Sequence, residues 1–125
     1  MPNTAEVLEQ LSRSFRLGVI SNSDGRIAKV LEEVGIAHCF ESFTDSGIVG
    51  HEKPHPDIFA AAIKSVGVDP AETVYVGDIY SVDYLGAKAA GMDAILLDVS
   101  GAYHDRKLSR VESLAELKKK FPPEP

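Results

Sequence analysis

A chain of 125 residues is long enough for one domain with a single hydrophobic core, and too short for an additional cap domain. Its 13 basic and 19 acidic residues give a net charge of −6, which argues against nucleic acid or an anionic membrane as a partner. Cys39 is the only cysteine, and neither a signal peptide nor a long apolar run is found, so we expect a cytoplasmic protein without disulfides.

The apolar pattern alternates between helix and strand along the whole chain. In chain order it predicts helix 7–15, strand 17–20, helix 24–35, a strand near residue 43, helix 56–67, strand 73–77, helix 82–91, strand 94–97 and helix 113–117. We expect the second helix to bury one stripe, formed by Ile27, Val30, Leu31 and Val34. Short apolar strands that alternate with helices predict an α/β fold, with a mostly parallel sheet covered by helices on both faces.

Polar side chains capable of phosphoryl chemistry stand at the ends of the predicted strands. Ser21 and Asn22 follow the first strand and offer a hydroxyl and an amide, next to backbone N–H groups at a helix start that suit phosphate oxygens. Lys53 precedes a proline on an extended segment and could neutralise a phosphoryl group in transfer. Asp78 ends the 73–77 strand and Asp83 follows, a carboxylate pair suited to Mg²⁺.

Each of these residues also has an ordinary structural explanation. Serine and aspartate after a strand are common turn or cap residues, and a lysine near prolines is usually only solvated. The case for a site rests on their order on successive strand–helix units. The carboxyl ends of parallel strands share one edge of the sheet, where ligands bind.

Three segments resemble known family motifs. Residues 20–23 (Ile-Ser-Asn-Ser), residues 53–59 (Lys-Pro-His-Pro-Asp-Ile-Phe), and Gly77-Asp78 with Asp83 resemble motifs II, III and IV of the haloacid dehalogenase (HAD) superfamily. The match is closest to its phosphatase branch with a small inserted cap. This resemblance implies a three-layer, Rossmann-like core.

The resemblance also implies a role for each residue. In that family, an aspartate on the first strand attacks the phosphorus, and a second aspartate two residues later acts as general acid and base. Ser21, followed by Asn22, would bind the phosphoryl oxygens, and Lys53 would stabilise the aspartyl-phosphate intermediate. Asp78 and Asp83 would hold Mg²⁺, directly or through water.

The family's nucleophile motif is absent, because no Asp-x-Asp pair occurs in the 125 residues. The resemblance therefore implies that residues 1–125 form a single truncated HAD-like core that lacks the usual first, central strand and the cap. A circular permutation with Asp98 as nucleophile is an alternative, since residues 96–98 are an apolar run ending in aspartate. The family usually has a similar aspartate after its last strand, and Ser100 stands where the acid/base would be.

A missing central strand would leave its two neighbours about 10 Å apart, with unpaired backbone groups between them. Either the neighbours close up or another strand fills the space. We therefore expect a homo-oligomer or a partner chain that supplies a strand. The family's cap largely selects the substrate, so the sequence indicates a small phosphorylated molecule without identifying it.

Three functions compete. The first is Mg²⁺-dependent phosphate monoester hydrolysis through an aspartyl-phosphate, incomplete in this chain because the nucleophile is missing. The second is a non-catalytic HAD-like module that binds Mg²⁺ or phosphate, or serves in interactions, and needs a partner chain. The missing Asp-x-Asp pair favours the non-catalytic module as the function of the isolated chain. Descent from a phosphate hydrolase is favoured by the presence of Ser21, Lys53, Asp78 and Asp83. The third, a phosphoacceptor receiver domain, needs an acidic pair where Ser21-Asn22 stands.

Overall fold

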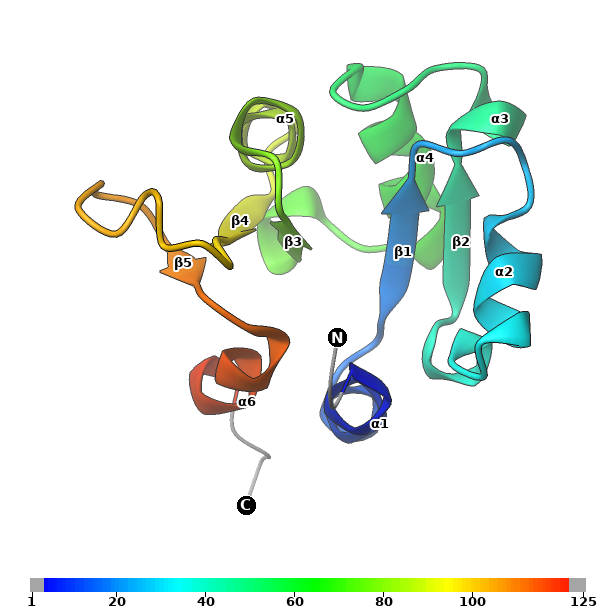
Figure 1. The fold of residues 1–125 in the computed structure, drawn as a ribbon. Helices are drawn as coiled ribbons and strands as arrows, with labels where there is room; N and C mark the ends of the chain where they lie inside the picture. The colour runs from blue at the N-terminus through cyan, green and yellow to red at the C-terminus, as the bar shows by residue number, and fades with distance from the viewer. Residues whose placement is uncertain (1–3, 122–125) are drawn as a thin grey trace.

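A computed structural model describes residues 4–121 and has the expected α/β architecture (Figure 1). The strands are β1 (Gly18–Ser21), β2 (Ser42–Asp45), β3 (Val74–Gly77), β4 (Asp93–Leu97) and β5 (Arg110–Val111). The helices are α1 (Thr4–Ser14), α2 (Ile27–Glu33), α3 (Ser46–Val49), α4 (Pro56–Val66), α5 (Leu85–Ala89) and α6 (Leu117–Lys120). Among these residues, every helix is too short or too polar to serve as a membrane span.

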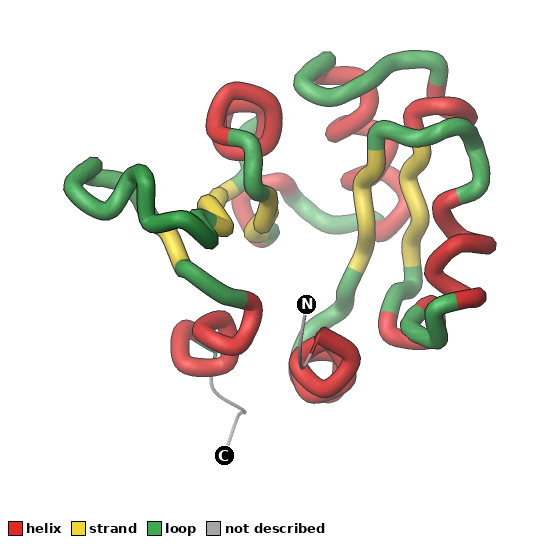
Figure 2. The backbone as a smooth tube through the Cα atoms, in the orientation of Figure 1, coloured by secondary structure: helices red, strands yellow, loops and turns green. Residues whose placement is uncertain are grey.

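The strands form two separate sheets. β1 pairs in parallel with β2, while β3, β4 and β5 form a second parallel sheet in that order. Figure 2 shows the strands in two groups, with no strand of the described chain between β1 and β3. The predicted α/β fold class with parallel strands is confirmed, and within residues 4–121 β1 and β3 have no strand between them.

The strands β1 and β3 have not closed up against each other. A cavity of about 540 Å³ lies between them. We call this cavity the slot. Both strands line it, and so do residues of α1, α4 and α6: Leu11, Phe15, Val19, Ile20, Ala62, Ile63, Val66, Val74, Tyr75, Val76, Leu117 and Phe121 are among them. Val74 of β3 remains 41% exposed, as expected for a strand that has a partner on one side only.

The core consists of two buried clusters. One crosses between the two sheets: it joins Ile20 of β1 and the fully buried Ile58 and Phe59 of α4 to Ala87 of α5 and Ala94 of β4. The other joins α1 to the second sheet and to α6, through Val7, Leu11, Ile95, Val111 and Leu117. Burial of a phenylalanine such as Phe59 stabilises a fold by about 2–3 kcal/mol, so the first cluster helps to hold α4 and β1 against the second sheet.

Most predicted elements are confirmed, and α4 shows why. Pro56 occupies its first turn, the ring of His55 caps it by accepting the N–H of Asp57, and Gly67 ends it with a left-handed φ of 69°. The two-residue β5 was missed, because so short a strand carries no periodic signal.

The predicted buried stripe of α2 is wrong. Val30 and Val34 are 46% and 63% exposed, and no residue of α2 is buried. In Figure 1 this helix lies at the outer side of β2, the end strand of a two-stranded sheet. So narrow a sheet offers too little surface to cover the apolar face of the helix.

Candidate functional site

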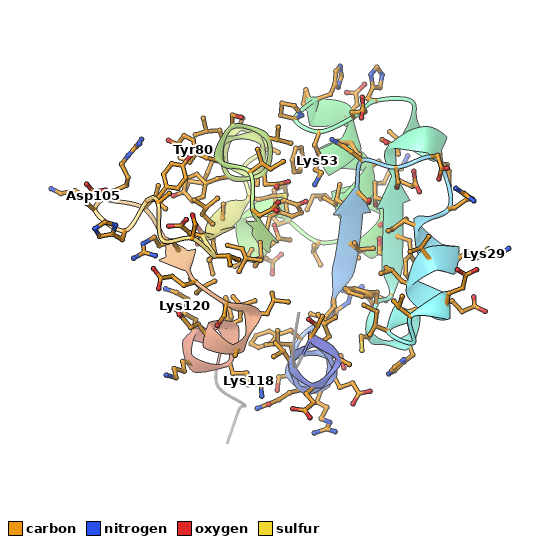
Figure 3. The ribbon with its side chains drawn as sticks, in the orientation of Figure 1. Lys29, Lys53, Tyr80, Asp105, Lys118 and Lys120 are labelled. Carbon is orange, nitrogen blue, oxygen red and sulfur yellow. The ribbon has the colours of Figure 1, made fainter. Side chains whose placement is uncertain are left out.

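Lys53 lies at the centre of the site and pairs with Asp83. Its Nζ is 2.7 Å from Asp83 Oδ1, and the two side chains are only 12% and 3% exposed. Lys53 comes from the segment before α4, whereas Asp83 lies in the π-helical turn Tyr80–Tyr84 after β3. This ion pair therefore links the segment before α4, where Figure 3 labels Lys53, to the turn after β3.

Tyr75 of β3 completes the cluster. Lys53 Nζ donates to its hydroxyl oxygen at 2.8 Å, and that oxygen lies 3.3 Å from both Asp83 Oδ1 and the carbonyl oxygen of Ile20. Burial works to lower the pKa of Lys53, but the hydrogen bonds to Asp83 and Tyr75 outweigh it and hold that pKa above its usual value. Burial raises the pKa of Tyr75 as well. The lysine is thus a fixed positive charge, in keeping with its predicted role toward an anionic group.

Asn22 positions Lys53 through its backbone. Its Oδ1 accepts the N–H of Lys53 at 2.7 Å, and its Nδ2 donates to the carbonyl oxygen of Lys53 at 3.3 Å. Both ends of the amide are used, so the side chain that we expected at a phosphate instead links the end of β1 to the lysine segment. The geometry makes Asn22 a positioning residue.

Ser21 is the last residue of β1 and is partly buried. Within residues 4–121, its hydroxyl has no hydrogen-bond partner, so it is free to bind a ligand oxygen. It precedes Asn22, which holds Lys53, and the three predicted residues are therefore brought to one edge of the first sheet.

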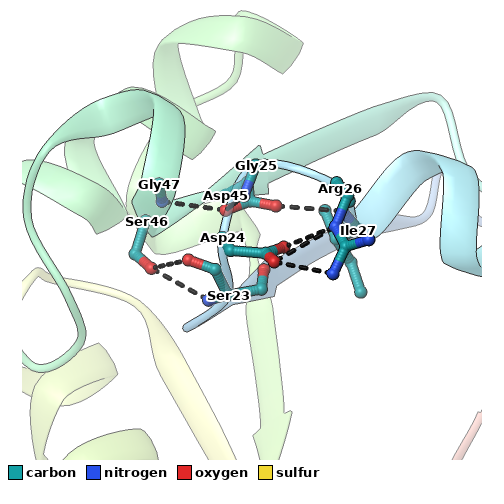
Figure 4. A network of polar contacts seen from close by, with 8 residues as sticks. All are labelled: Ser23, Asp24, Gly25, Arg26, Ile27, Asp45, Ser46 and Gly47. Atoms are coloured by element: carbon teal, nitrogen blue, oxygen red, sulfur yellow. Dashed lines mark hydrogen bonds and ion pairs between the residues drawn. The ribbon is translucent and has the colours of Figure 1, made fainter.

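Three backbone N–H groups after β1, those of Ser23, Gly25 and Ile27, are engaged by side chains at the end of β2 and the start of α3, so these three do not face a phosphate. Asp45, the last residue of β2, accepts the N–H groups of Gly25, Gly47 and Ile27 at 2.8, 2.8 and 3.0 Å (Figure 4). Asp45 is 1% exposed. Burial works to raise its pKa, but these hydrogen bonds outweigh it and hold the pKa below its usual value.

Sequence reasoning missed Asp45 and Tyr75. The signal for Asp45 was present, since an aspartate at a strand end followed by Ser46 and Gly47 is typical of a helix cap. Tyr75 gave no signal, because a tyrosine inside an apolar strand is first interpreted as a core residue.

Asp78 and Asp83, the predicted metal ligands, differ in their surroundings. Asp78 follows β3, is exposed, and has no hydrogen-bond or ion-pair partner in the described part of the chain. Asp83 accepts the N–H of Ile79 at 3.0 Å in addition to the lysine. Gly77 lies directly against Asp83, since a Cβ at Gly77 would clash with its Cβ and Cγ. A buried and a free carboxylate thus follow the same strand.

Asp98, the alternative nucleophile, has a structural role. Its oxygens accept the N–H groups of Ala102 and Tyr103 at 3.1 and 2.9 Å, and Arg110 lies 3.5 Å away. These contacts hold the loop between β4 and β5. Both carboxylate oxygens are therefore occupied by the loop itself.

The chain is similar to known proteins over most of its length. Residues 1–91 match the family model of the haloacid dehalogenase-like hydrolases. The chain is 44% identical over 101 residues to a glyceraldehyde 3-phosphate phosphatase from Methanothermobacter thermautotrophicus, covering 78% of this chain and 44% of that protein. It is 38% identical over 104 residues to haloacid dehalogenase-like hydrolase domain-containing protein 3 from Bos taurus, covering 77% of this chain and 41% of the relative. The chain thus spans less than half the length of these two relatives.

Solved structures agree with the fold. A HAD phosphatase from Thermococcus onnurineus superposes with a TM-score of 0.90 at 31% identity, over 99% of this chain and 59% of that one. The HAD hydrolase YfnB from Bacillus subtilis, solved with bound magnesium, superposes with a TM-score of 0.89 over 98% of this chain and 56% of that one. At 19% identity the second likeness shows the fold alone. With the family model matched over residues 1–91, this chain belongs to the haloacid dehalogenase-like hydrolases.

Proposed function

We propose that residues 1–125 form a truncated core domain of a Mg²⁺-dependent phosphomonoester hydrolase, whose nucleophilic aspartate comes from outside these residues. The observation that carries this proposal is the cluster of Lys53 with Asp83 and Tyr75, next to the free hydroxyl of Ser21 and the free carboxylate of Asp78. The named activity of the archaeal relative, a phosphatase, supports a small phosphorylated substrate.

Each residue has a task in this reaction. Lys53 places a positive charge beside the phosphoryl group and neutralises charge that develops on its oxygens during transfer. Ser21 donates its hydroxyl to one of these oxygens. Asn22 keeps the lysine segment against the end of β1, so that the ammonium approaches in a fixed direction.

The carboxylates fit the metal that the family implies. Mg²⁺ prefers oxygen ligands and is commonly bound by one or two carboxylates plus water and phosphate. Asp78 is free to bind it directly, and Asp83 has spare lone pairs for a bound water even while it accepts from Lys53 and Ile79. When bound, the metal would neutralise phosphate charge and orient the group.

The test is hydrolysis of p-nitrophenyl phosphate with and without Mg²⁺, with Asp78→Asn as control. If a carboxylate is supplied, for example by a second subunit, activity should require Mg²⁺, Lys53 and Asp78. Calorimetric titration with Mg²⁺ tests the metal site independently of turnover. Mg²⁺ that binds the wild type and Asp78→Asn equally would refute the assignment of the metal ligands.

The slot supports a strand as the missing component. It is mostly apolar, it lies between two strands that each pair on one side only, and its lining includes Tyr75, whose hydroxyl contacts Lys53. A strand in the slot would satisfy the unpaired backbone groups of β1 and β3. The strand would come from a second copy or from a partner polypeptide.

Light scattering over a range of concentrations tests this expectation. If a second copy supplies the strand, we expect a dimer that dissociates on dilution. If a separate polypeptide supplies it, we expect a chain of low stability that becomes more stable when a peptide with that strand is added. A well-folded and stable monomer at all concentrations, unaffected by added segments, would contradict both.

A non-catalytic module is the second candidate, and the absence of any Asp-x-Asp pair from the 125 residues favours it for the isolated chain. It predicts binding of Mg²⁺ or phosphate without turnover under any conditions. We propose a cytoplasmic location for the protein, whether it is a hydrolase or a non-catalytic module. The single cysteine, Cys39, is free, which suits a reducing compartment.

A further inference from the structure

Two histidines on the segment between α3 and α4 gather with an aspartate in the first turn of α4. His51, His55 and Asp57 each offer a ligand atom, and these three atoms lie within 4.8 Å of one another. His51 Nε2 is 3.5 Å from Asp57 Oδ2, and His55 Nδ1 is 4.0 Å from Asp57 Oδ1. The two imidazole rings stack at 4.0 Å between centroids, with 17° between their planes.

The backbone holds this cluster in place. Gly50 turns the chain out of α3 in a left-handed conformation, with φ of 92°. The N–H of His55 donates to the carbonyl oxygen of Glu52 at 2.9 Å, which folds the segment back so that both rings lie on one side. Pro56 then fixes the start of α4, where Asp57 is in the first turn. The three side chains are thus brought together by local structure, although each is exposed.

We propose that His51, His55 and Asp57 bind a divalent transition-metal ion of the Zn²⁺ class. Imidazole and carboxylate donors suit Zn²⁺, Co²⁺, Ni²⁺ or Cu²⁺, whereas Mg²⁺ prefers oxygen donors alone. Three protein ligands leave one position of a tetrahedral ion open to water. The site is therefore chemically distinct from the Asp78 and Asp83 pair.

Binding needs the exposed side chains to turn. Ligand atoms around a tetrahedral Zn²⁺ lie about 3.3 Å apart, and the two stacked rings must also rotate out of their nearly parallel arrangement so that both nitrogens point at the ion. His55 gives up part of its role as helix cap, because its Nδ1 now accepts the N–H of Asp57 at 3.1 Å. The loss of this capping hydrogen bond on metal binding limits the affinity for the ion and makes binding reversible.

Bound metal would also fix the segment that carries Lys53, which lies between the two histidines in the sequence. The ion would link the first part of that segment to the start of α4. It would bind without any strand in the slot, so the proposal is independent of the phosphatase activity.

The experiment is calorimetric titration of tag-free protein with Zn²⁺ in the presence of millimolar Mg²⁺, in the Asp78→Asn background. Removal of Asp78 keeps Zn²⁺ from competing for the proposed Mg²⁺ site. We expect one equivalent of Zn²⁺ to bind, and His51→Ala or His55→Ser to weaken this binding by about tenfold or more. Serine at position 55 still caps α4, so this variant tests the ligand without loss of the helix.

The two remaining histidines provide matched controls. His38→Ala and His104→Ala should leave the Zn²⁺ affinity within about twofold, because neither residue belongs to the cluster. Co²⁺ in place of Zn²⁺ should give visible absorption that disappears in His51→Ala. The proposal is overturned if Zn²⁺ does not bind, if His51→Ala and His55→Ser bind it as tightly as the parent, or if His38→Ala removes the binding.

Discussion

The buried ion pair between Lys53 and Asp83 allows a quantitative prediction. At 2.7 Å and an effective dielectric constant of about 20, the charges attract by about 6 kcal/mol, most of which offsets the cost of removing both from water. Removal of one partner leaves the other buried without a counter-charge. Asp83→Asn should therefore lower the free energy of unfolding by about 3–5 kcal/mol, since it leaves the charge of Lys53, whose side chain is only 12% exposed, without a counter-charge.

Lys53→Met should cost about 2 kcal/mol, because Asp83 still accepts the N–H of Ile79. The double variant loses both charges together and should cost less than the sum of the single changes, with a coupling of about 2 kcal/mol. Urea unfolding followed by circular dichroism measures all four proteins.

The exposed pair of Lys88 and Asp93 is the matched control. Its atoms are 3.6 Å apart and its side chains are 49% and 67% exposed, so Lys88→Met should change the stability by about 0.5 kcal/mol or less. Two results would contradict a stabilising role of the Lys53–Asp83 pair. In one, the effects of Lys53→Met and Asp83→Asn on the free energy of unfolding simply add; in the other, Lys88→Met costs as much as Lys53→Met.

Three further predictions concern the stability of the fold, each measured by thermal or urea unfolding. Gly77→Ala should cost about 1–3 kcal/mol, because its new Cβ meets a buried side chain, whereas Gly18→Ala should cost less, since the nearest atom to its Cβ is 3.4 Å away. Asp45→Ala should cost about 3 kcal/mol, since three backbone N–H groups lose their acceptor, and an unchanged midpoint would refute this role. Lys53 and Tyr75 hold their protons more tightly when folded than at their ordinary pKa values of 10.5 and 10.0. Their contribution to the free energy of unfolding is therefore fully present below about pH 10 and is lost as the pH rises through the folded pKa values. This loss should be smaller in Lys53→Met. A free energy of unfolding that rises with pH in this range would contradict the cluster.

Much of the fold could be predicted because its signals are local. The apolar runs of β1, β3 and β4 and the caps of α4 depend on residues close together in the sequence. The gap between β1 and β3 in residues 4–121 agrees with the expectation from the family resemblance, which implies a strand at this place. The exposure of the α2 stripe was not predictable, since periodicity shows which face of a helix is apolar but not whether another element covers it.

The candidate site was predicted only in part. The sequence and its family resemblance identified Ser21, Lys53, Asp78 and Asp83 as residues of one edge of the sheet. The partners of these residues depend on distances between segments far apart in the chain. Thus Asn22 binds the backbone of Lys53 across 31 positions, a contact for which sequence spacing carries no signal.

The sequence by itself determined the family, the order of helices and strands, and the identity of the polar groups at the strand ends, because these follow from short-range patterns and motifs. Only the tertiary structure decided that Lys53 is charged and paired with Asp83, that Asp45 accepts the N–H groups of Gly25 and Ile27, and that the slot stays open. The physical reason is the same in each case. Burial, charge pairing and cavity volume arise from packing between distant segments, which neither propensity nor periodicity encodes.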